Sequence, residues 1–440
     1  MKPLDTEGLR DIRRNLTAAF VALGDRPTPL AAAGFQRELA IKLLAAEAQL
    51  AEAPRKGRET ILDHIRLLRA HGDALAWGQL HPHAIRQFRK GGGRPHSLSS
   101  QRAALDNALA IVDGFASDGV LALVTDLTTH LQLGDVIVAD APEAPTIIEC
   151  KSKLPPDNSM LLGRRGRQAA KLQGTAQYLE RGVAQLHGET RVRLCFEATK
   201  PIVPRWEQVR TAVDLALAEG KGSIQQIERG AVLWVRVGDE APPPETAAVC
   251  ADFRDLIIGA HVRFLDDDSP LMPPPLAWPL SELARWHLME MDLGVVMILD
   301  LARFSELAAE RGRTINILDP LALEVVSEGL PYVASERFVG ECLYNFHPID
   351  AQVEMLLEFV DHVARQGIVQ GRSDASPPTP VGAPHRVHRV ESEADIVRLA
   401  QRDVNGRDSV MISAELWSKI APGKRPRLLF WETGSRDTED

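Results

Sequence analysis

The chain has 440 residues, which is long for a single hydrophobic core, so we expect two or three domains. Hydrophobic residues make up 45% of it and charged residues 25%, a balance that excludes a disordered or fibrous protein. The formal net charge of -9 argues against a protein that coats nucleic acid with its whole surface, although a local basic patch is compatible with it.

Cysteine usage and hydropathy limit the compartment and the kinds of site. Four cysteines stand far apart in the sequence, without a C-x-x-C pair or a nearby histidine cluster: Cys150, Cys195, Cys250 and Cys342. This spacing indicates neither a zinc site nor a disulfide framework. No apolar stretch approaches the roughly 20 residues of a membrane helix, and the N-terminus lacks the apolar segment of a signal peptide. We therefore expect a cytoplasmic protein that does not bind a membrane.

The first hundred residues have a helical pattern. Between residues 9 and 80, leucine and isoleucine recur at three- and four-residue spacing, with Ala, Arg and Glu between them. Residues 81–100 read as a helix that ends in a basic, glycine-rich loop. Ser99 or Ser100 can then cap another helix, which we expect to reach about residue 115.

The pattern then changes to one of alternating strands and helices. Three strand-like runs at residues 120–124, 133–139 and 146–150 predict a meander. The runs that follow predict, in order, a helix over 165–186, a strand over 192–198, a helix over 206–218 and a strand over 232–237. This order predicts an α/β (or α+β) core with a mixed sheet flanked by helices.

Proline-rich stretches mark the later boundaries. After the prolines at 242–244 we expect helices again, over residues 251–366, and the prolines of 371–386 indicate an extended linker. The predicted domains are a helical N-terminal region (1–98), the α/β core (99–240), a mainly helical C-terminal domain (241–370), the linker (371–386) and a tail (387–440).

The residues most typical of catalysis lie within the predicted meander. Asp135 follows Gly134 at the start of one strand, and Glu149-Cys150-Lys151 ends the next. Side chains two apart on a strand share a face, so Glu149 and Lys151 project together, and a hairpin brings Asp135 close to Glu149. Two converging carboxylates suit Mg²⁺ or Mn²⁺, with the Cys150 carbonyl able to complete the shell. Lys151 can position a nucleophile or stabilise charge.

This pattern resembles the PD-(D/E)XK nuclease superfamily, through Asp135 and Glu149-Cys150-Lys151 within apolar strands. The resemblance covers residues 100–240. It implies a restriction-endonuclease-like fold and a Mg²⁺-dependent endonuclease that hydrolyses phosphodiester bonds in DNA, with RNA not excluded. A role in bacterial defence against foreign DNA or in DNA repair follows by analogy, as does a homodimer.

The same resemblance extends to the helix after Lys151. Gln168, Gln173, Gln177 and Tyr178 are similar to the glutamines and tyrosine of recombination-type members, so Gln173 or Gln177 is expected to face the site. A basic cluster next to it is expected to contact phosphates: Lys153, Arg164, Arg165, Arg167 and Lys171. Family members often carry a further acid in the helix before the first strand. That helix offers only Asp106 and Asp113, with Asp126 as another candidate, and the fourth carboxylate stays unassigned.

Other readings remain open. Asp135 can be a turn residue, and Glu149 with Lys151 an exposed ion pair. An E-x-K triplet alone carries little weight, because Glu219-Gly220-Lys221 also matches it, in a glycine-rich turn at the end of a helix. The core could instead be a non-catalytic scaffold or nucleic-acid-binding module. A third alternative places the function in residues 251–366 as a protein-interaction domain.

Overall fold

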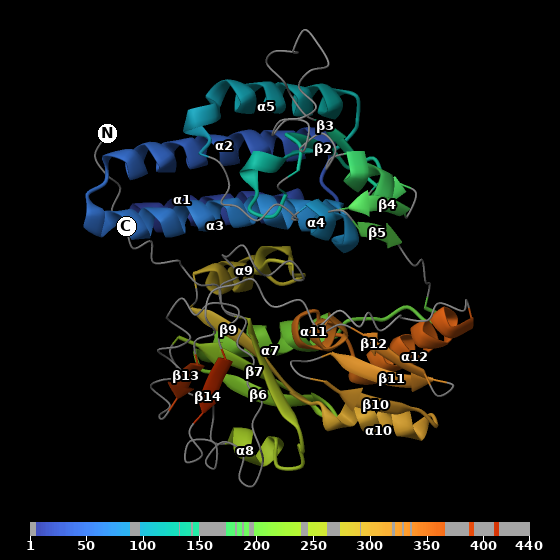
Figure 1. Ribbon diagram of the computed structural model, residues 1–440. Helices are drawn as coiled ribbons and strands as arrows, with labels where there is room; N and C mark the ends of the chain where they lie inside the picture. The colour runs from blue at the N-terminus through green and yellow to red at the C-terminus, as the bar shows by residue number, and fades with distance from the viewer. Residues whose placement is uncertain are drawn as a thin grey trace. The chain divides into compact units, whose positions relative to one another are not determined.

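Three long helices form the N-terminal part of the chain in the computed structural model: α1 (Thr6–Leu23), α2 (Pro29–Glu52) and α3 (Arg55–Gln79) (Figure 1). The Thr28 hydroxyl accepts a hydrogen bond from Ala31 N at 3.3 Å, and Pro29 takes the first helical position, so local sequence sets the start of α2. The short helix α4 (Pro82–Phe88) follows. These helices confirm the helical pattern predicted for residues 9–80.

The structure describes most of the chain apart from a few internal segments and much of the C-terminal end. The described residues are 6–88, 97–131, 133–141, 144–148, 173–180, 183–186, 189–192, 198–238, 245–261, 273–290, 292–318, 322–327, 330–334, 337–365, 387–390 and 409–412. The predicted linker, 371–386, lies outside them, as does most of the predicted tail.

A 3₁₀ turn, η1 (Ser99–Gln101), leads into α5 (Arg102–Ser117). The helix was predicted, but its cap was not predicted correctly: Gln101 is the N-cap residue, and it makes no side-chain capping hydrogen bond. Ser99 instead donates its backbone N–H to Glu47 Oε2 at 2.8 Å. A partner from α2, distant in the sequence, therefore replaces the local cap.

The predicted meander is present as a three-stranded antiparallel sheet of β1 (Ala122–Val124), β2 (Val136–Val138) and β3 (Thr146–Ile148). Val124 pairs with Val136, and Val136 pairs with Ile148. The turn η2 (Thr125–Leu127) follows β1. Helices α2 and α5 pack against β1, and the buried side chains of both helices and of β1 and β2 belong to one hydrophobic core.

The segment after the meander departs from the prediction. Residues 173–180 are helical, but the helix predicted to continue to 186 gives way to a strand, β4 (Val183–Leu186), which pairs with β5 (Glu189–Val192). Of the strand predicted over 192–198, Val192 is in a strand, as the last residue of β5, whereas Ala198 has no regular structure; residues 193–197 lie outside the described residues. Cross-strand pairing between β4 and β5 determines the conformation of these residues, and helical periodicity in the sequence does not reveal such pairing.

A four-stranded antiparallel sheet with the strand order β6-β7-β9-β8 organises the next part of the chain. Its strands are β6 (Ser223–Glu228), β7 (Ala231–Val237), β8 (Leu256–His261) and β9 (Leu293–Asp300). Helix α7 (Trp206–Glu219) packs on β6 and β7 and confirms the helix predicted for 206–218; β7 confirms the strand at 232–237. Between the strands lie α8 (Glu245–Val249), η4 (Pro275–Ala277) and α9 (Glu282–Met289).

A second antiparallel sheet, with the order β10-β11-β12, follows. Its strands are β10 (Thr314–Ile317), β11 (Leu323–Ser327) and β12 (Leu330–Ala334). The helices of this part of the chain are α10 (Ala302–Glu310), before the sheet, and α11 (Arg337–Tyr344) and α12 (Ile349–Arg365), after it. The expectation of a mainly helical region over 251–366 is therefore wrong, because its described residues include five strands, β8 to β12. Towards the C-terminus, β13 (Val387–Val390) and β14 (Ser409–Ile412) pair in parallel.

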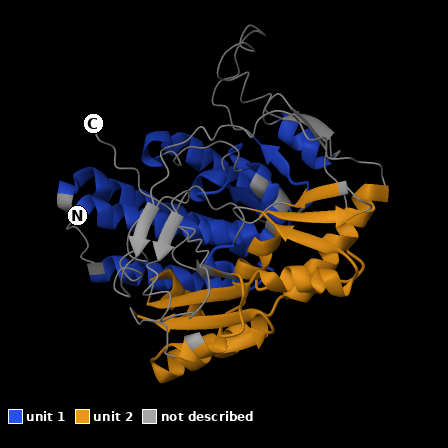
Figure 2. Ribbon diagram, turned by 60° about the horizontal axis from the view of Figure 1, so that its bottom comes forward, with its two compact units in different colours: residues 1–195, 273–278 blue, residues 196–272, 279–440 orange. Residues whose placement is uncertain are grey.

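The chain divides into two compact units, coloured separately in Figure 2. Unit 1 comprises residues 1–195 together with 273–278, and unit 2 comprises 196–272 together with 279–440. The N-terminal helices and the meander thus share one unit, whereas the sequence analysis separated them at residue 98. The architecture is α/β in the broad sense: helices combined with small, mostly antiparallel sheets.

Candidate functional site

Asp135 stands immediately before β2, beside the end of β3. Its backbone N–H donates to Ile148 O at 2.8 Å, and its carbonyl accepts from Thr125 N at 3.1 Å. The residue is half-buried. Ile148 is the residue directly before Glu149 in the sequence, so the hairpin register brings Asp135 to the point where the chain enters the predicted Glu149-Cys150-Lys151 triplet.

Gly134 permits this close approach of the strands. Its φ of +75° lies in the left-handed region that favours glycine. A Cβ at this position would lie 2.4 Å from Ile147 Cγ2 and 3.1 Å from Ile148 O. Both the backbone conformation and the contact with β3 therefore require glycine at the residue before Asp135.

The other members of the predicted centre lie outside the described residues. These are Glu149, Cys150 and Lys151 together with the predicted phosphate contacts Lys153, Arg164, Arg165, Arg167 and Lys171. Within the described ranges, no three His, Cys, Asp or Glu side chains gather as metal ligands would. That finding concerns Asp135 but neither Glu149 nor the Cys150 carbonyl.

Two of the predicted glutamines, Gln173 and Gln177, fall on the helical segment 173–180, whereas Gln168 lies outside the described residues. Gln173 is exposed and Gln177 is half-buried, whereas Tyr178 is buried with 7% of its surface accessible. The tyrosine thus belongs to the interior, and the two glutamines retain exposed surface. The expectation that Gln173 or Gln177 faces Asp135 stays a prediction.

The acids considered for the fourth carboxylate lie in two settings. Asp106 pairs with Arg102 one turn earlier on α5 at 3.0 Å, and Asp113 is paired with Arg37 of α2. Both are therefore engaged in ion pairs of helix surfaces. Asp126 is half-buried in η2, where its negative charge acts on the guanidinium of Arg69.

A buried charged cluster behind the meander was missed by the sequence analysis. Arg69 of α3 is only 4% exposed; its Nη1 donates to the carbonyls of Asp126 and Thr128, the latter at 3.2 Å, and its Nη2 lies 3.8 Å from Glu47 Oε1. Burial lowers the pKa of the Arg69 guanidinium, against the opposing effect of the nearby Glu47, Asp126 and Asp73 carboxylates. A buried cation is here balanced by several oxygens.

Glu47 of α2 ties the loop before α5 to this cluster. Its carboxylate accepts the backbone N–H groups of Leu98 and Ser99, at 2.9 and 2.8 Å, and the Ser97 hydroxyl at 2.8 Å. Burial alone would raise the pKa of Glu47, but the backbone bonds from Ser99 and Leu98, with the serine hydroxyls, lower it overall. The group is thus held as a carboxylate.

Asp73 of α3 holds the segment between η2 and β2. Its Oδ1 accepts the backbone N–H groups of Thr129 and His130 at 2.9 and 3.0 Å, and the carboxylate is 3% exposed. Between Arg69 and Asp73, Gly72 lets the helix touch η2, since a Cβ there would lie 2.3 Å from Leu127 O. The sequence signal is a pair of charges one turn apart within residues 67–76 of α3, where every other residue except His71 is apolar or small. All ten of these residues are buried.

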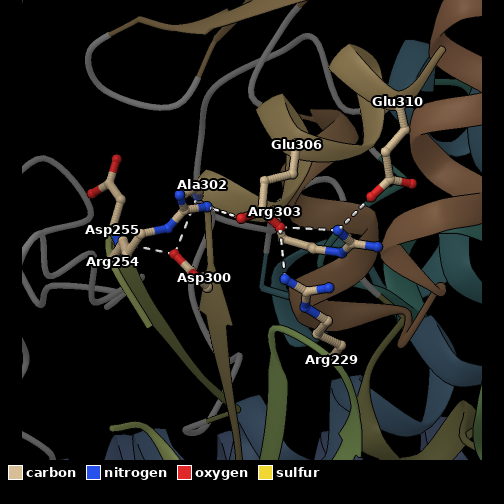
Figure 3. A network of polar contacts seen from close by, with 8 residues as sticks. All are labelled: Arg229, Arg254, Asp255, Asp300, Ala302, Arg303, Glu306 and Glu310. Carbon is tan, nitrogen blue, oxygen red and sulfur yellow. Dashed lines mark hydrogen bonds and ion pairs between the residues drawn. The ribbon is translucent and has the colours of Figure 1, made fainter. Parts of the chain in front are cut away.

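Unit 2 carries a separate ion-pair network on its surface (Figure 3). Glu306 of α10 pairs with Arg229 at 3.5 Å, with Arg303 at 2.9 Å and with Arg254; Arg303 also contacts Glu310 at 3.0 Å. The hydrogen bond from Arg303 and the charges of Arg254 and Arg229 lower the pKa of Glu306. Arg229 and Arg254 are largely exposed, so the network joins the β6–β7 turn and the start of β8 to α10 with modest stabilisation.

Asp300, at the end of β9, makes a second set of contacts beside this network (Figure 3). Its Oδ1 accepts the backbone N–H groups of Asp255 at 2.8 Å and Ala302 at 3.2 Å, as Figure 3 shows. The side chain is 6% exposed. It therefore joins β8, β9 and the start of α10, which is an organising role.

The second E-x-K triplet behaves as the sequence analysis anticipated. Gly220 ends α7 in the left-handed conformation, with φ of +65°, and Lys221 Nζ lies 3.3 Å from Glu219 Oε2. The two side chains are 69% and 46% exposed. This triplet is an ion pair at a helix end.

Comparison of the chain with models of protein families, with curated proteins and with solved structures found no match. Among the helices that the structure describes, none is both long and apolar enough to cross a membrane.

Proposed function

We propose that the chain is a metal-dependent nuclease with its active site at Asp135, Glu149 and Lys151. The observation that carries the proposal is the hydrogen bond from Asp135 N to Ile148 O, which fixes the register of the β2–β3 hairpin. In that register a half-buried carboxylate stands beside the chain position that leads into Glu149. A meander with this acid placement supports a restriction-endonuclease-like core.

The donor set fits a hard divalent cation. The Asp135 and Glu149 carboxylates and the Cys150 carbonyl would hold Mg²⁺ or Mn²⁺, since these ions prefer oxygen ligands. When bound, the metal would polarise a phosphodiester and lower the pKa of a water molecule. Lys151 would stabilise the charge that develops on the phosphate, and Gln173 or Gln177 would help to orient the groups that react.

The substrate we propose is DNA. The basic residues between Lys151 and Lys171 would neutralise backbone phosphates locally, which reconciles a nuclease with the net charge of -9. A homodimer would supply one centre for each strand of a duplex. Action against foreign DNA or in DNA repair, in the cytoplasm, is the setting that such an enzyme suits.

The test uses purified full-length protein with supercoiled plasmid, linear duplex, single-stranded DNA and RNA, each with Mg²⁺, Mn²⁺ or EDTA. We expect metal-dependent cleavage by the wild type and, for Lys151→Ala, a rate lower by about 10²-fold or more, because a charge-stabilising donor is removed. Lys221→Ala is the matched control, since it alters the second E-x-K triplet on an exposed helix end.

A second pair of variants separates charge from fold. Asp135→Asn should abolish cleavage, whereas Asp140→Asn, an exposed acid beyond the other end of β2, should leave it unchanged. If folded wild-type protein cuts none of the substrates, the alternative of a non-catalytic nucleic-acid-binding scaffold takes precedence. If Lys221→Ala and Lys151→Ala lose activity equally, the assignment of the centre is wrong.

A further inference from the structure

Thr125 connects the turn after β1 to the backbone of the predicted metal ligand. Its hydroxyl donates to Gly134 O at 2.7 Å, and its backbone N–H donates to Asp135 O at 3.1 Å. The side chain is 2% exposed. One residue thus fixes both peptide units that flank the Asp135 Cα.

The turn that carries Thr125 is itself held by side chains. Thr128 Oγ1 donates to Thr125 O at 2.8 Å and accepts from Leu131 N at 3.0 Å. Arg69 donates to the carbonyls of Asp126 and Thr128, and Asp73 accepts the N–H groups of the next two residues, Thr129 and His130. Backbone groups of residues 126, 128, 129 and 130 are therefore tied to α3.

Packing of α3 on the turn does not by itself require buried charged side chains such as Arg69 and Asp73. Burying ionised groups costs several kcal/mol each, and well-packed apolar residues often stabilise such a contact at least as well. Charged groups that hydrogen-bond to a backbone, unlike apolar side chains, hold that backbone in one defined position. The position held here is that of Thr125, one hydrogen bond from Asp135.

We propose that Thr125 is a positioning residue for the Asp135 carboxylate, and that Arg69 and Asp73 anchor the turn through which it acts. The inference rests on the proposed metal centre and assigns it a supporting shell from α3. Residues that orient metal ligands without touching the metal commonly control its affinity. The N-terminal helices would then be part of the nuclease centre rather than a separate attachment.

The test titrates full-length protein with Mn²⁺ alone, by calorimetry, and measures plasmid cleavage beside it. Thr125→Val keeps the side-chain shape but removes the hydroxyl, so we expect Mn²⁺ affinity to fall by about tenfold or more. Thr125→Ser restores the hydroxyl and should recover most of the affinity. Thr17→Val is the matched control: a buried threonine of unit 1, bonded to His71 instead of the meander, whose loss should leave Mn²⁺ affinity unchanged.

A second variant covers the case in which Thr125→Val does not fold. Asp73→Asn keeps an acceptor for Thr129 and His130 but removes its charge, and charge-assisted bonds are about twice as strong as neutral ones. We expect weaker Mn²⁺ binding in that variant also, by about fivefold. Unchanged affinity in either folded variant would overturn the positioning role.

Asp135→Asn distinguishes failure of this inference from failure of the proposed function. If the wild type binds Mn²⁺, Asp135→Asn does not, and Thr125→Val binds as the wild type does, only the positioning role is wrong. If wild type and Asp135→Asn have the same affinity, or neither binds, the metal centre itself is wrong and the positioning role is overturned with it.

Discussion

Gly134 occupies a place in unit 1 where a single methyl group would have two separable effects. Its φ of +75° strains any L-residue, and a Cβ would overlap Ile147 Cγ2 at 2.4 Å. Gly119 has nearly the same φ, +78°, but a Cβ there would meet nothing within 4 Å. The two glycines therefore separate backbone strain from steric overlap.

We predict that Gly119→Ala lowers the free energy of unfolding by about 1–2 kcal/mol, the cost of a left-handed conformation for an L-residue. Gly134→Ala should cost a further ~1–3 kcal/mol, because β3 must move to admit the methyl group. Urea unfolding of the two variants measures the difference. Equal losses would show that the strands do not approach as closely as the structure places them.

At the same scale, the candidate site was only partly predictable. Asp135, Glu149 and Lys151 could be proposed because a period of two residues places side chains on one face of a strand. Arg69 and Asp73 could not, because the groups of the turn that they bind stand more than fifty residues away in the sequence, at Asp126, Thr128 and Thr129. The local pattern around the two charges suggests that they are buried, but it does not indicate which distant groups they bind.

Between the helices α1 and α3, two buried histidines act as neutral hydrogen-bonding groups. Arg13 Nη1 donates to His64 Nδ1 at 3.1 Å, and the Thr17 hydroxyl lies 3.1 Å from His71 Nε2, whose Nδ1 donates to Leu67 O at 2.9 Å. Burial lowers the pKa of His64 to about 3, with the charges of Arg13 and His71 adding to the effect, and burial lowers that of His71 to about 4. Protonation of either ring would oppose the contact between the two helices.

We predict that stability falls as the pH falls from about 6.5 towards 4. In the unfolded chain both histidines bind protons below about pH 6.5. In the folded protein His71 takes up its proton only near pH 4 and His64 only near pH 3, so acid favours the unfolded state. At pH 5 each histidine should cost about 2 kcal/mol relative to pH 7 or above.

The measurement is urea unfolding at pH 7 and pH 5 for the wild type and for His71→Gln. The glutamine cannot take up the proton, so the variant should lose about 2 kcal/mol less than the wild type over this interval. A variant that shows the full wild-type loss would mean that His71 is protonated in the folded protein.

Prediction of the elements succeeded where amphipathic periodicity was clear and failed where it was absent. Helices α3, α5 and α7 have an apolar face, and the meander strands are bounded by turn residues. Every residue of β9 is buried, so its continuous apolar run has no alternation to mark it as a strand. Its pairing with β7 and β8 decides the conformation.

For the molecule as a whole, the path of the chain prevents one cut from separating the two units. Residues 273–278 lie between β8 and β9 in the sequence but belong to unit 1. A fragment that ends at residue 240 would therefore lose this segment from unit 1 and the partner strand β9 from β7. Truncation there would damage both units, so point substitutions are the better probe of how each is stabilised.

Trp278 provides such a probe. Its side chain is 1% exposed, its Nε1 donates to Pro273 O at 3.2 Å, and the adjoining turn η4 packs against α3. We predict that Trp278→Ala destabilises unit 1 by about 3–5 kcal/mol, the usual cost of removing a buried aromatic side chain. Hydrogen exchange followed by mass spectrometry should show faster exchange in peptides of α3 and little change in those of β7 and β9.

Trp206→Ala is the reciprocal control, because that indole belongs to unit 2, where its ring centroid lies 4.8 Å from that of Phe346. It should speed exchange around α7 and leave α3 protected. If both substitutions accelerate exchange throughout the chain, the units unfold together as one cooperative structure. If each effect is confined to its own unit, then residues 273–278, which lie within the unit 2 sequence, stabilise the helices of unit 1, the unit that contains Asp135.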